Sequence, residues 1–314
     1  MINPLLTIII PNYNGRQILE ENLPKILESV SNDKVEIVVV DDASTDDSVE
    51  FLSTAYASIV VKKHDVNKGF ASTVNDGVIG ASAEIVFLLN SDAVPPVGFV
   101  HRILEHFNDK NTFAVGCLLQ SEEDGKVVQR GRGVGAFRKG LFVHGPGSID
   151  KKNTLWVTAG AAAYSKSLWA KLNGMDTLYN PFYWEDIDIS YRALKSGFDV
   201  KFDPTIGVKH TQSKGAIRTH YDSSIIRRTA YRNQFIFHWK NITDAKALFL
   251  HFFWMPYHLL AALLRGDLAF FYGFLQAIVR LPTIVRHRSR DSSFFTQTDS
   301  QVVQPFVEEF NSQV

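Results

Sequence analysis

The chain of 314 residues has one cysteine, no net charge, and no repeat or low-complexity tract. Because Cys117 is alone, an intramolecular disulfide framework and a cysteine zinc cluster are excluded, which favours a reducing compartment. Zero net charge gives no support to nucleic-acid binding. No Gly-x-Gly-x-x-Gly follows the first apolar run, which disfavours a dinucleotide-dependent oxidoreductase. That run, Leu5–Ile10, is short and has no basic region before it, so we interpret it as a strand rather than a signal peptide.

The neutral total hides an uneven distribution of charge. Residues 1–200 carry 19 Lys and Arg against 25 Asp and Glu, whereas residues 201–314 carry 14 against 8. The first part is therefore rich in carboxylates, and the tail suits anionic surroundings such as phosphates or lipid headgroups. Composition changes near residue 215, so we expect an α/β domain at 1–215 and a helical extension at 216–314.

Apolar runs at Leu5–Ile10, Val35–Val40 and Glu84–Leu89 predict strands buried on both faces, as in a mostly parallel sheet flanked by helices. Ligands then gather at the carboxyl ends of the strands. The helical patterns lie at 15–30, 46–55, 70–81 and 96–108, the second with Asp46 as N-cap. Further along, the sequence predicts a loop or irregular hairpin at 121–154, strands at 155–164 and 199–202, and helices at 165–172 and 185–196.

Polar residues follow each early strand. Asp41 and Asp42 offer acceptors for the N–H and hydroxyl groups of a nucleoside, and the same residues also suit a polar turn. Asp92, at the end of Asn90-Ser91-Asp92, suits a divalent cation that bridges two phosphates, although the tripeptide also suits a turn. Asn67-Lys68-Gly69-Phe70 opens a helix whose backbone N–H groups can approach a phosphate or simply be capped.

An acidic cluster opens the helical pattern at 185. Glu185 and Asp186 complement the helix dipole, which is ordinary helix design, or one of them serves as a general base. In the second interpretation, an acceptor sugar stacks on the ring of Trp184. His210 follows a strand-like segment and is either a metal ligand or a structural histidine.

Taken together and in order, these motifs resemble family 2 glycosyltransferases, above all the rhamnosyltransferase-like enzymes of bacterial cell-surface glycans. The resemblance spans about residues 1–235. The motifs that carry it are Pro11-Asn12-Tyr13-Asn14, Asp41-Asp42-Ala43-Ser44-Thr45-Asp46, Asn67-Lys68-Gly69-Phe70, Asn90-Ser91-Asp92, Gly160-Ala161-Ala162, Gly174-Met175-Asp176, Glu185-Asp186-Ile187-Asp188 and His210.

The resemblance implies a GT-A fold, a UDP- or dTDP-linked sugar donor, a divalent cation (Mg²⁺ or Mn²⁺), and inversion by direct displacement. It places the nucleotide sugar against Pro11, Tyr13, Asp41, Asp42, Asn67, Gly69, Asn90 and Ser91, and the cation on Asp92 and His210. It makes Asp186 the base, with Glu185 as the alternative. Asn90 stands where many members have Asp. There is no Gln-x-x-Arg-Trp motif, so addition of one or a few sugars is favoured over processive synthesis.

The tail contains two apolar, aromatic segments at 248–264 and 268–285, followed by basic residues. As a helix, the first is about 26 Å long, slightly short of a hydrocarbon core of about 30 Å. We expect both to lie on the cytoplasmic face of the cell membrane, near a lipid-linked or oligosaccharide acceptor. A buried or dimer-forming hairpin is the alternative.

Two other functions fit parts of the pattern. A nucleotidyltransferase that makes an activated sugar also needs a metal and carboxylates, but the glycine-rich triphosphate loop followed by basic residues is not evident near the start of the chain. A sugar-nucleotide-binding protein that has lost turnover is suggested only by Asn90.

Overall fold

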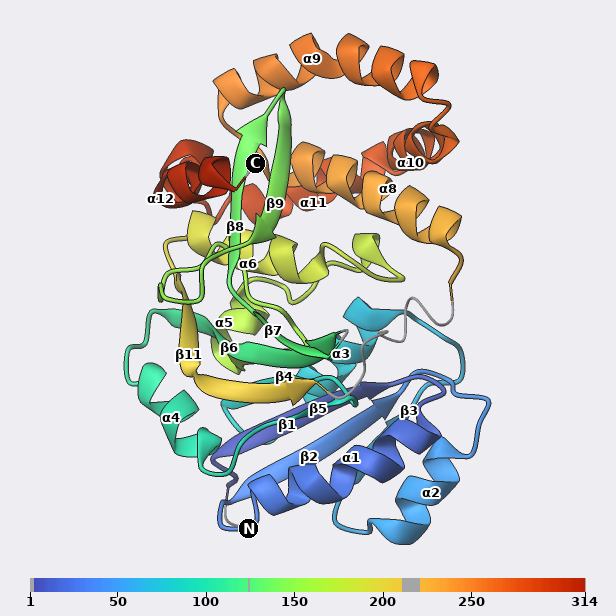
Figure 1. The fold of residues 1–314 in the computed structure, drawn as a ribbon, viewed down its shortest axis with the longest axis vertical. Coiled ribbons are helices and arrows are strands. Elements are labelled where there is room, and N and C mark those ends of the chain that lie inside the picture. The colour runs from blue at the N-terminus through green and yellow to red at the C-terminus, as the bar shows by residue number, and fades with distance from the viewer. Residues whose placement is uncertain (1–2, 124, 211–220, 314) are drawn as a thin grey trace.

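The computed structural model describes residues 3–123, 125–210 and 221–313. A nine-stranded sheet forms one end of the molecule, and a layer of helices forms the other (Figure 1). The strand order is β3-β2-β1-β4-β10-β6-β11-β5, with β7 paired to β6. The predicted boundary between residues 215 and 216 lies outside the described residues.

The first half of the chain forms a βαβ unit in which β3, β2, β1 and β4 are parallel. The three predicted strands and four predicted helices are confirmed within a few residues, and β3 and β5 were not predicted. The second helix begins after Asp47; Asp46 instead accepts hydrogen bonds from Arg16 and Ser48. The elements are β1 (Leu6–Asn12), α1 (Arg16–Ser29), β2 (Val35–Asp41), α2 (Ser48–Ala55), β3 (Val60–Lys63), α3 (Phe70–Gly80), β4 (Ile85–Leu89), β5 (Ala93–Val94) and α4 (Phe99–His106).

The second part extends the sheet with antiparallel pairings. The strand predicted at 155–164 begins only at Ala161, because β10 pairs on both sides only from there on. The strand predicted at 199–202 continues to His210, past a shift in register between Asp203 and Gly207. The elements are β6 (Thr112–Glu123), β7 (Lys126–Arg130), β8 (Gly133–Arg138), β9 (Leu141–Pro146), β10 (Ala161–Ser165), α5 (Lys166–Lys171), the 3₁₀ turn η1 (Thr177–Tyr179), α6 (Glu185–Lys195) and β11 (Asp199–His210).

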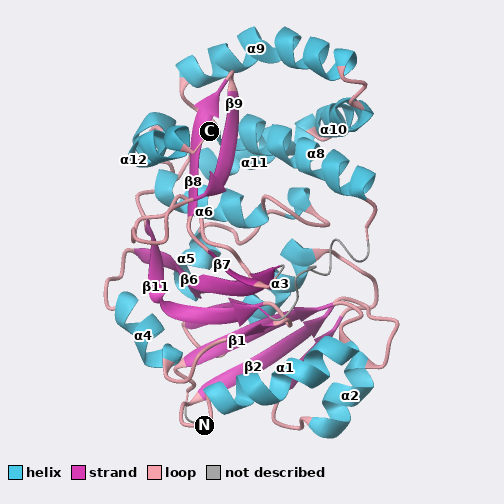
Figure 2. Cartoon of the chain, viewed as in Figure 1, coloured by secondary structure: helices cyan, strands magenta, loops and turns pink. Residues whose placement is uncertain are grey.

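The tail consists of helices, as predicted (Figure 2). Its buried side chains share a core with the rest of the chain. Apolar side chains of α6 and of the β8–β9 hairpin pack with those of the tail, among them Tyr191, Phe142 and Phe237. Helices α8 and α10 cross so closely that a Cβ on Gly273 would lie 2.8 Å from the backbone of α8. The elements are α8 (Ser223–Asn241), α9 (Ala245–Leu264), α10 (Leu268–Val279), α11 (Leu281–Ser292) and α12 (Asp299–Ser312).

Helix α9 lies across the end of the molecule that is farthest from the sheet, on the tip of the β8–β9 hairpin (Figure 1). His251 Nδ1 donates to the Gly140 carbonyl at 2.9 Å, and His258 Nε2 donates to the Lys139 carbonyl at 2.8 Å. Exposed apolar side chains cover its other side: Phe249, Phe252, Phe253, Leu260, Leu263 and Leu264. Among the described helices, α9 is long and apolar enough to cross a membrane, and α10 and α11 pass the same test as a pair bent by 65°.

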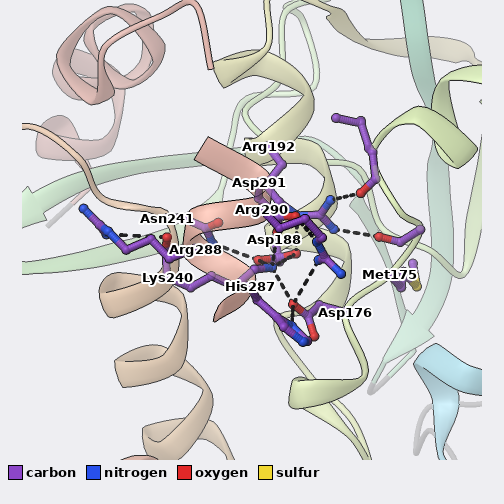
Figure 3. A network of polar contacts seen from close by, with 12 residues as sticks. Met175, Asp176, Asp188, Arg192, Lys240, Asn241, His287, Arg288, Arg290 and Asp291 are labelled. Atoms are coloured by element: carbon purple, nitrogen blue, oxygen red, sulfur yellow. Dashed lines mark hydrogen bonds and ion pairs between the residues drawn. The ribbon is translucent and has the colours of Figure 1, made fainter. Parts of the chain in front are cut away.

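A buried ionic network joins α6 to the tail (Figure 3). Lys240 on α8 is fully buried, and its Nζ lies 2.8 Å from both Asp188 Oδ1 and Asp176 Oδ2. Arg192 also pairs with Asp188, at 2.7 Å, and donates to the carbonyls of Leu172 and Gly174. Without these cations, burial of the ionised carboxylates would cost a large amount of free energy. The carboxylate on α6 and the lysine on the tail are therefore both needed for either to be buried in its charged form.

We predict that Lys240→Met lowers the free energy of unfolding by about 3–5 kcal/mol, since it removes a cation shared by three buried carboxylates, those of Asp176, Asp188 and Asp291. Lys246→Met, at an exposed position on α9, is the matched control and should change stability by less than about 0.5 kcal/mol. Urea unfolding measures both. Adding Asp188→Asn to Lys240→Met should restore part of the loss, and a Lys240→Met protein as stable as the wild type would contradict the role of the ion pairs.

Candidate active site

Asp41 and Asp42 follow one another at the end of β2, and both carboxylates accept hydrogen bonds from other residues of the chain. Asp41 is fully buried and accepts hydrogen bonds from the backbone and hydroxyl of Ser44, at 2.9 and 2.5 Å. Asp42 accepts from the backbone N–H groups of Lys68 and Gly69, at 2.8 and 2.9 Å. Asp41 therefore shapes the loop after β2, and Asp42 connects that loop to the turn before α3.

Pro11 and Tyr13 lie at the end of the neighbouring strand. The pairing of Pro11 with Val40 brings the ends of β1 and β2 side by side. The Tyr13 side chain is 37% exposed. Tyr221, which sequence reasoning missed, lies close to both loops: burial and the nearby Tyr13 and Asp42 raise the pKa of its phenol. The structure thus brings the predicted nucleoside-binding residues together at one edge of the sheet.

His64 is a second residue that sequence reasoning missed. It is buried beyond the end of β3, with Nδ1 2.8 Å from Asp42 Oδ1 and Nε2 2.8 Å from Asp76 Oδ2. His64 therefore connects the loop after β2 to helix α3. Its place just after a strand, before the Asn67–Phe70 motif, was the signal that could have identified it.

The turn before α3 requires glycine at position 69. Gly69 has a φ of 84°, and a Cβ there would lie 2.8 Å from Asn180 Cγ. Asn180 donates to the Lys68 carbonyl at 2.5 Å and accepts from Ala71 N at 3.2 Å. The loop before α6 therefore contacts the predicted nucleotide-binding turn, while the neighbouring Asn67 is exposed.

Asp92 and His210 meet because β5 pairs with β11. The register places His210 opposite Ala93, and His210 Nε2 lies 3.2 Å from Asp92 Oδ1. Asp92 is only 6% exposed. Within residues 3–123, 125–210 and 221–313, no group of three or more His, Cys, Asp and Glu side chains has the spacing of a metal site. Among the described residues, the structure therefore brings one carboxylate and one imidazole together at the predicted metal site.

Asn90 and Ser91 connect this pair to the acidic cluster of α6. Asn90 N donates to the Gly160 carbonyl at 3.0 Å, and Ser91 begins the turn to Asp92. One residue before Gly160, the backbone N–H of Ala159 donates to the Asp186 carboxylate. The segment at 158–160 therefore lies between the predicted metal ligands and the predicted base.

Glu185 and Asp186 have different ionisation behaviour. Burial raises the pKa of Asp186 to about 6, although backbone N–H groups of Ile187 and Ala159 oppose the shift. Burial and the neighbouring Asp186 charge raise the pKa of Glu185 to about 8. The two carboxyls titrate as a pair, so they share one proton in the pH range between the two values. Two carboxyls with separated pKa values are typical of an active site.

The structure corrects the predicted role of Trp184. Trp184 is 6% exposed, and the centroid of its ring lies 4.8 Å from that of His144 and 5.2 Å from that of Phe237. Because the apolar core covers its faces, the indole does not offer a stacking surface to a sugar. Tyr183, the preceding residue, is the partly exposed aromatic side chain of this turn.

Comparisons with known proteins agree with this geometry. The family model for glycosyl transferase family 2 matches residues 7–172, more than half of the chain. The O-antigen chain rhamnosyltransferase WbaN of Salmonella anatum is 25% identical over 218 residues, which span 67% of each chain. The chain spans about half the length of other curated relatives that it matches.

Two solved structures show the same fold. Staphylococcus aureus TarS residues 1–349 with UDP-GlcNAc has a TM-score of 0.57 and 14% identity, with coverage of 96% of this chain and 91% of TarS. The mannosyltransferase PcManGT of Pyrobaculum calidifontis with GDP-Man and Mn²⁺ has a TM-score of 0.54 and 16% identity, with coverage of 100% and 87%.

The α/β architecture predicted from the strand pattern is therefore confirmed as the GT-A fold. The chain belongs to glycosyl transferase family 2, and it is a glycosyltransferase of the kind that acts on nucleotide sugars in glycan synthesis.

Proposed function

We propose that this glycosyltransferase inverts the anomeric centre, and that it moves a sugar from a UDP- or dTDP-linked donor to a saccharide or lipid-linked acceptor of a cell-surface glycan. The observation that carries the proposal is the convergence of two elements on segment 158–160: the Asn90–Asp92 loop and the Glu185–Asp186 turn. This convergence supports a base next to the predicted diphosphate-binding loop. The names of WbaN and of TarS, found with UDP-GlcNAc, support both the glycan and the donor class.

In the proposed reaction, Asp186 removes the proton of an acceptor hydroxyl while its oxygen attacks the anomeric carbon. The bond to the acceptor oxygen forms as the bond to the donor diphosphate breaks, and the proton ends on Asp186. Displacement from the opposite face inverts the centre without a covalent enzyme intermediate. Burial and the neighbouring Asp186 raise the pKa of Glu185 above that of Asp186, which favours Asp186 as the base.

The residues at the Asn90–Asp92 loop fit a divalent cation. The carboxylate suits Mg²⁺ or Mn²⁺, and the imidazole suits a transition-metal ion such as Mn²⁺ better than Mg²⁺. Asp92 and His210 would hold the ion, which when bound would neutralise charge on the leaving diphosphate. Asn90 brings no charge to the set, so the donor phosphates would supply more of the coordination.

The C-terminal helices support peripheral attachment to the cytoplasmic face of the membrane. Helix α9 has 20 residues, about 30 Å, which is enough to span. However, its middle is attached to the hairpin tip through His251 and His258, and Arg227 of α8 pairs with Asp267 at the start of α10 at 2.8 Å. A spanning α9 would separate elements that contact each other. We therefore propose that α9 lies in the plane of the interface with its aromatic side in the lipid.

The first prediction on the reaction concerns the donor site. One UDP- or dTDP-linked sugar should release its nucleoside diphosphate in the presence of Mn²⁺ or Mg²⁺, and the free diphosphate should raise the melting temperature only with the metal. Asp92→Asn should remove this metal dependence, whereas Asp47→Asn, at an exposed position, should not. Pyrophosphate release from a nucleoside triphosphate would instead identify a nucleotidyltransferase. Donor binding without turnover would identify a binding protein.

The second prediction concerns the base. Because the Asp186 carboxylate must be ionised, kcat/KM should fall as the pH drops through about 6. Asp186→Asn should lower kcat by about 10²-fold or more. It should also stabilise the fold at pH 7, because a carboxyl with a raised pKa destabilises the folded state at pH values above that pKa.

Glu185→Gln is the matched control, since it should keep most of the activity and the acid limb of the pH profile. If Glu185→Gln abolishes transfer and Asp186→Asn does not, the two assignments are reversed. Product analysis by NMR tests whether the anomeric centre is inverted.

The third prediction concerns the membrane. The full chain should sediment with vesicles that contain phosphatidylglycerol, and the triple variant Phe249→Ser/Phe252→Ser/Phe253→Ser should bind them at least about 100-fold more weakly. Ile79→Ser/Val127→Ser changes equally exposed apolar residues of the sheet domain and should bind as the wild type does. A wild-type chain that ignores vesicles and sediments as a dimer would show that this surface joins two copies.

A further inference from the structure

Two consecutive residues in left-handed conformation precede the catalytic carboxyls. Tyr183 has a φ of 72° and Trp184 a φ of 78°, and Glu185 is the first residue of α6. Bulky L-residues rarely adopt this conformation, and they persist in it only when the surrounding structure holds them there. This turn sets the direction in which α6 begins, and hence where Asp186 points.

An amide on α8 holds the turn. Asn233 is fully buried, and its Nδ2 lies 2.8 Å from the Tyr183 carbonyl oxygen, 2.9 Å from that of Phe182 and 3.0 Å from that of Tyr179. Two N–H groups are thus shared among three carbonyls. Arg232 Nε donates to Asn233 Oδ1 at 2.8 Å, which fixes the orientation of the amide. Burial of a side-chain amide is energetically unfavourable unless the amide is hydrogen-bonded. Both N–H groups of Asn233 donate to carbonyls of this segment.

The other end of the turn is held separately. Asp188 N donates to the Trp184 carbonyl at 2.8 Å, and Lys240 pairs with the Asp188 carboxylate. The Trp184 ring is packed in the core. The peptide carbonyls at 182 and 183, before α6 begins, are the groups that Asn233 secures.

We propose that Asn233 is a positioning residue, which holds the turn at Tyr183–Trp184 so that Asp186 faces the acceptor hydroxyl; this rests on the proposed role of Asp186 as the base. Asn233 does not act on the substrate itself. It lies on α8, beyond the residues 7–172 that the family model matches. The tail thus contributes to the geometry of the reaction as well as to the shared core.

Hydrogen–deuterium exchange tests the structural half without any substrate. In Asn233→Ala, the amides of residues 183–187 should exchange faster than in the wild type, while those of α3 should not change. Gln234→Ala, at the next position on α8, is the control, because its amide donates to Phe142 O on β9 instead. Unchanged exchange at 183–187 in Asn233→Ala overturns the proposal, whatever the activity.

Kinetics test the catalytic half, with the UDP- or dTDP-linked sugar that is found to release its nucleoside diphosphate. Asn233→Ala should lower kcat by about 10- to 100-fold, the order expected for a misplaced catalytic group, and leave the donor KM within about twofold. If exchange increases but kcat does not change, the link to catalysis is wrong. If Asp186→Asn remains active, the proposed base has failed, and the exchange result still decides the role of Asn233 in the turn.

A rescue variant separates positioning from general loss of packing. Glycine adopts a positive φ without steric cost, so Tyr183→Gly added to Asn233→Ala should recover most of kcat and slow the exchange again. Tyr183→Ala added to Asn233→Ala removes the same ring but keeps the backbone restriction, and it should not recover either. Equal recovery in both double variants would overturn the proposal. If Asn233→Ala does not fold, Asn233→Ser, which keeps one donor, carries the same comparison.

Discussion

The arrangement of the active site depends on one buried cation. The Lys240 ammonium lies between Asp176 and Asp188 (Figure 3), which stand at the two ends of the segment that carries the proposed catalytic carboxyls. A single charge on α8 thereby closes this segment into a loop of fixed span. Burial of the ionised carboxylates costs free energy that only the attraction to the cation offsets. The loop and the tail therefore form together. The tail is therefore part of the structure that holds the proposed catalytic carboxyls.

Much of the sheet domain follows from local sequence. Continuous β-branched runs such as Val35–Val40 can be satisfied only by strands buried on both faces, and the structure has them there. The carboxylates at the strand ends converge for the same reason, since parallel strands end at one edge. The pairing of Asp92 with His210 was predicted from the family resemblance alone, because it depends on β5 pairing with a distant strand.

Other features were beyond local reasoning. Strand β11 continues through Pro204 and Gly207, residues that usually end a strand, because its partner β6 accommodates a shift in register. Trp184 looked like a stacking platform from its neighbours, but aromatic residues of β9 and α8 cover it. Asn233 gave no signal at all, since a polar residue in a helix is ordinary until its burial is known. In each case the deciding contact comes from a distant part of the sequence.

The β8–β9 hairpin determines how far the active site stands from the apolar side of α9. The hairpin leaves the core that it shares with α6, and its tip carries the middle of α9 (Figure 1). Two hydrogen-bonded strands are stiff along their length, so the hairpin keeps this distance constant. With α9 in the proposed interfacial position, the acceptor hydroxyl must reach the active site at the same distance from the membrane surface. The hairpin would then select acceptors by the distance between their reactive sugar and their lipid anchor.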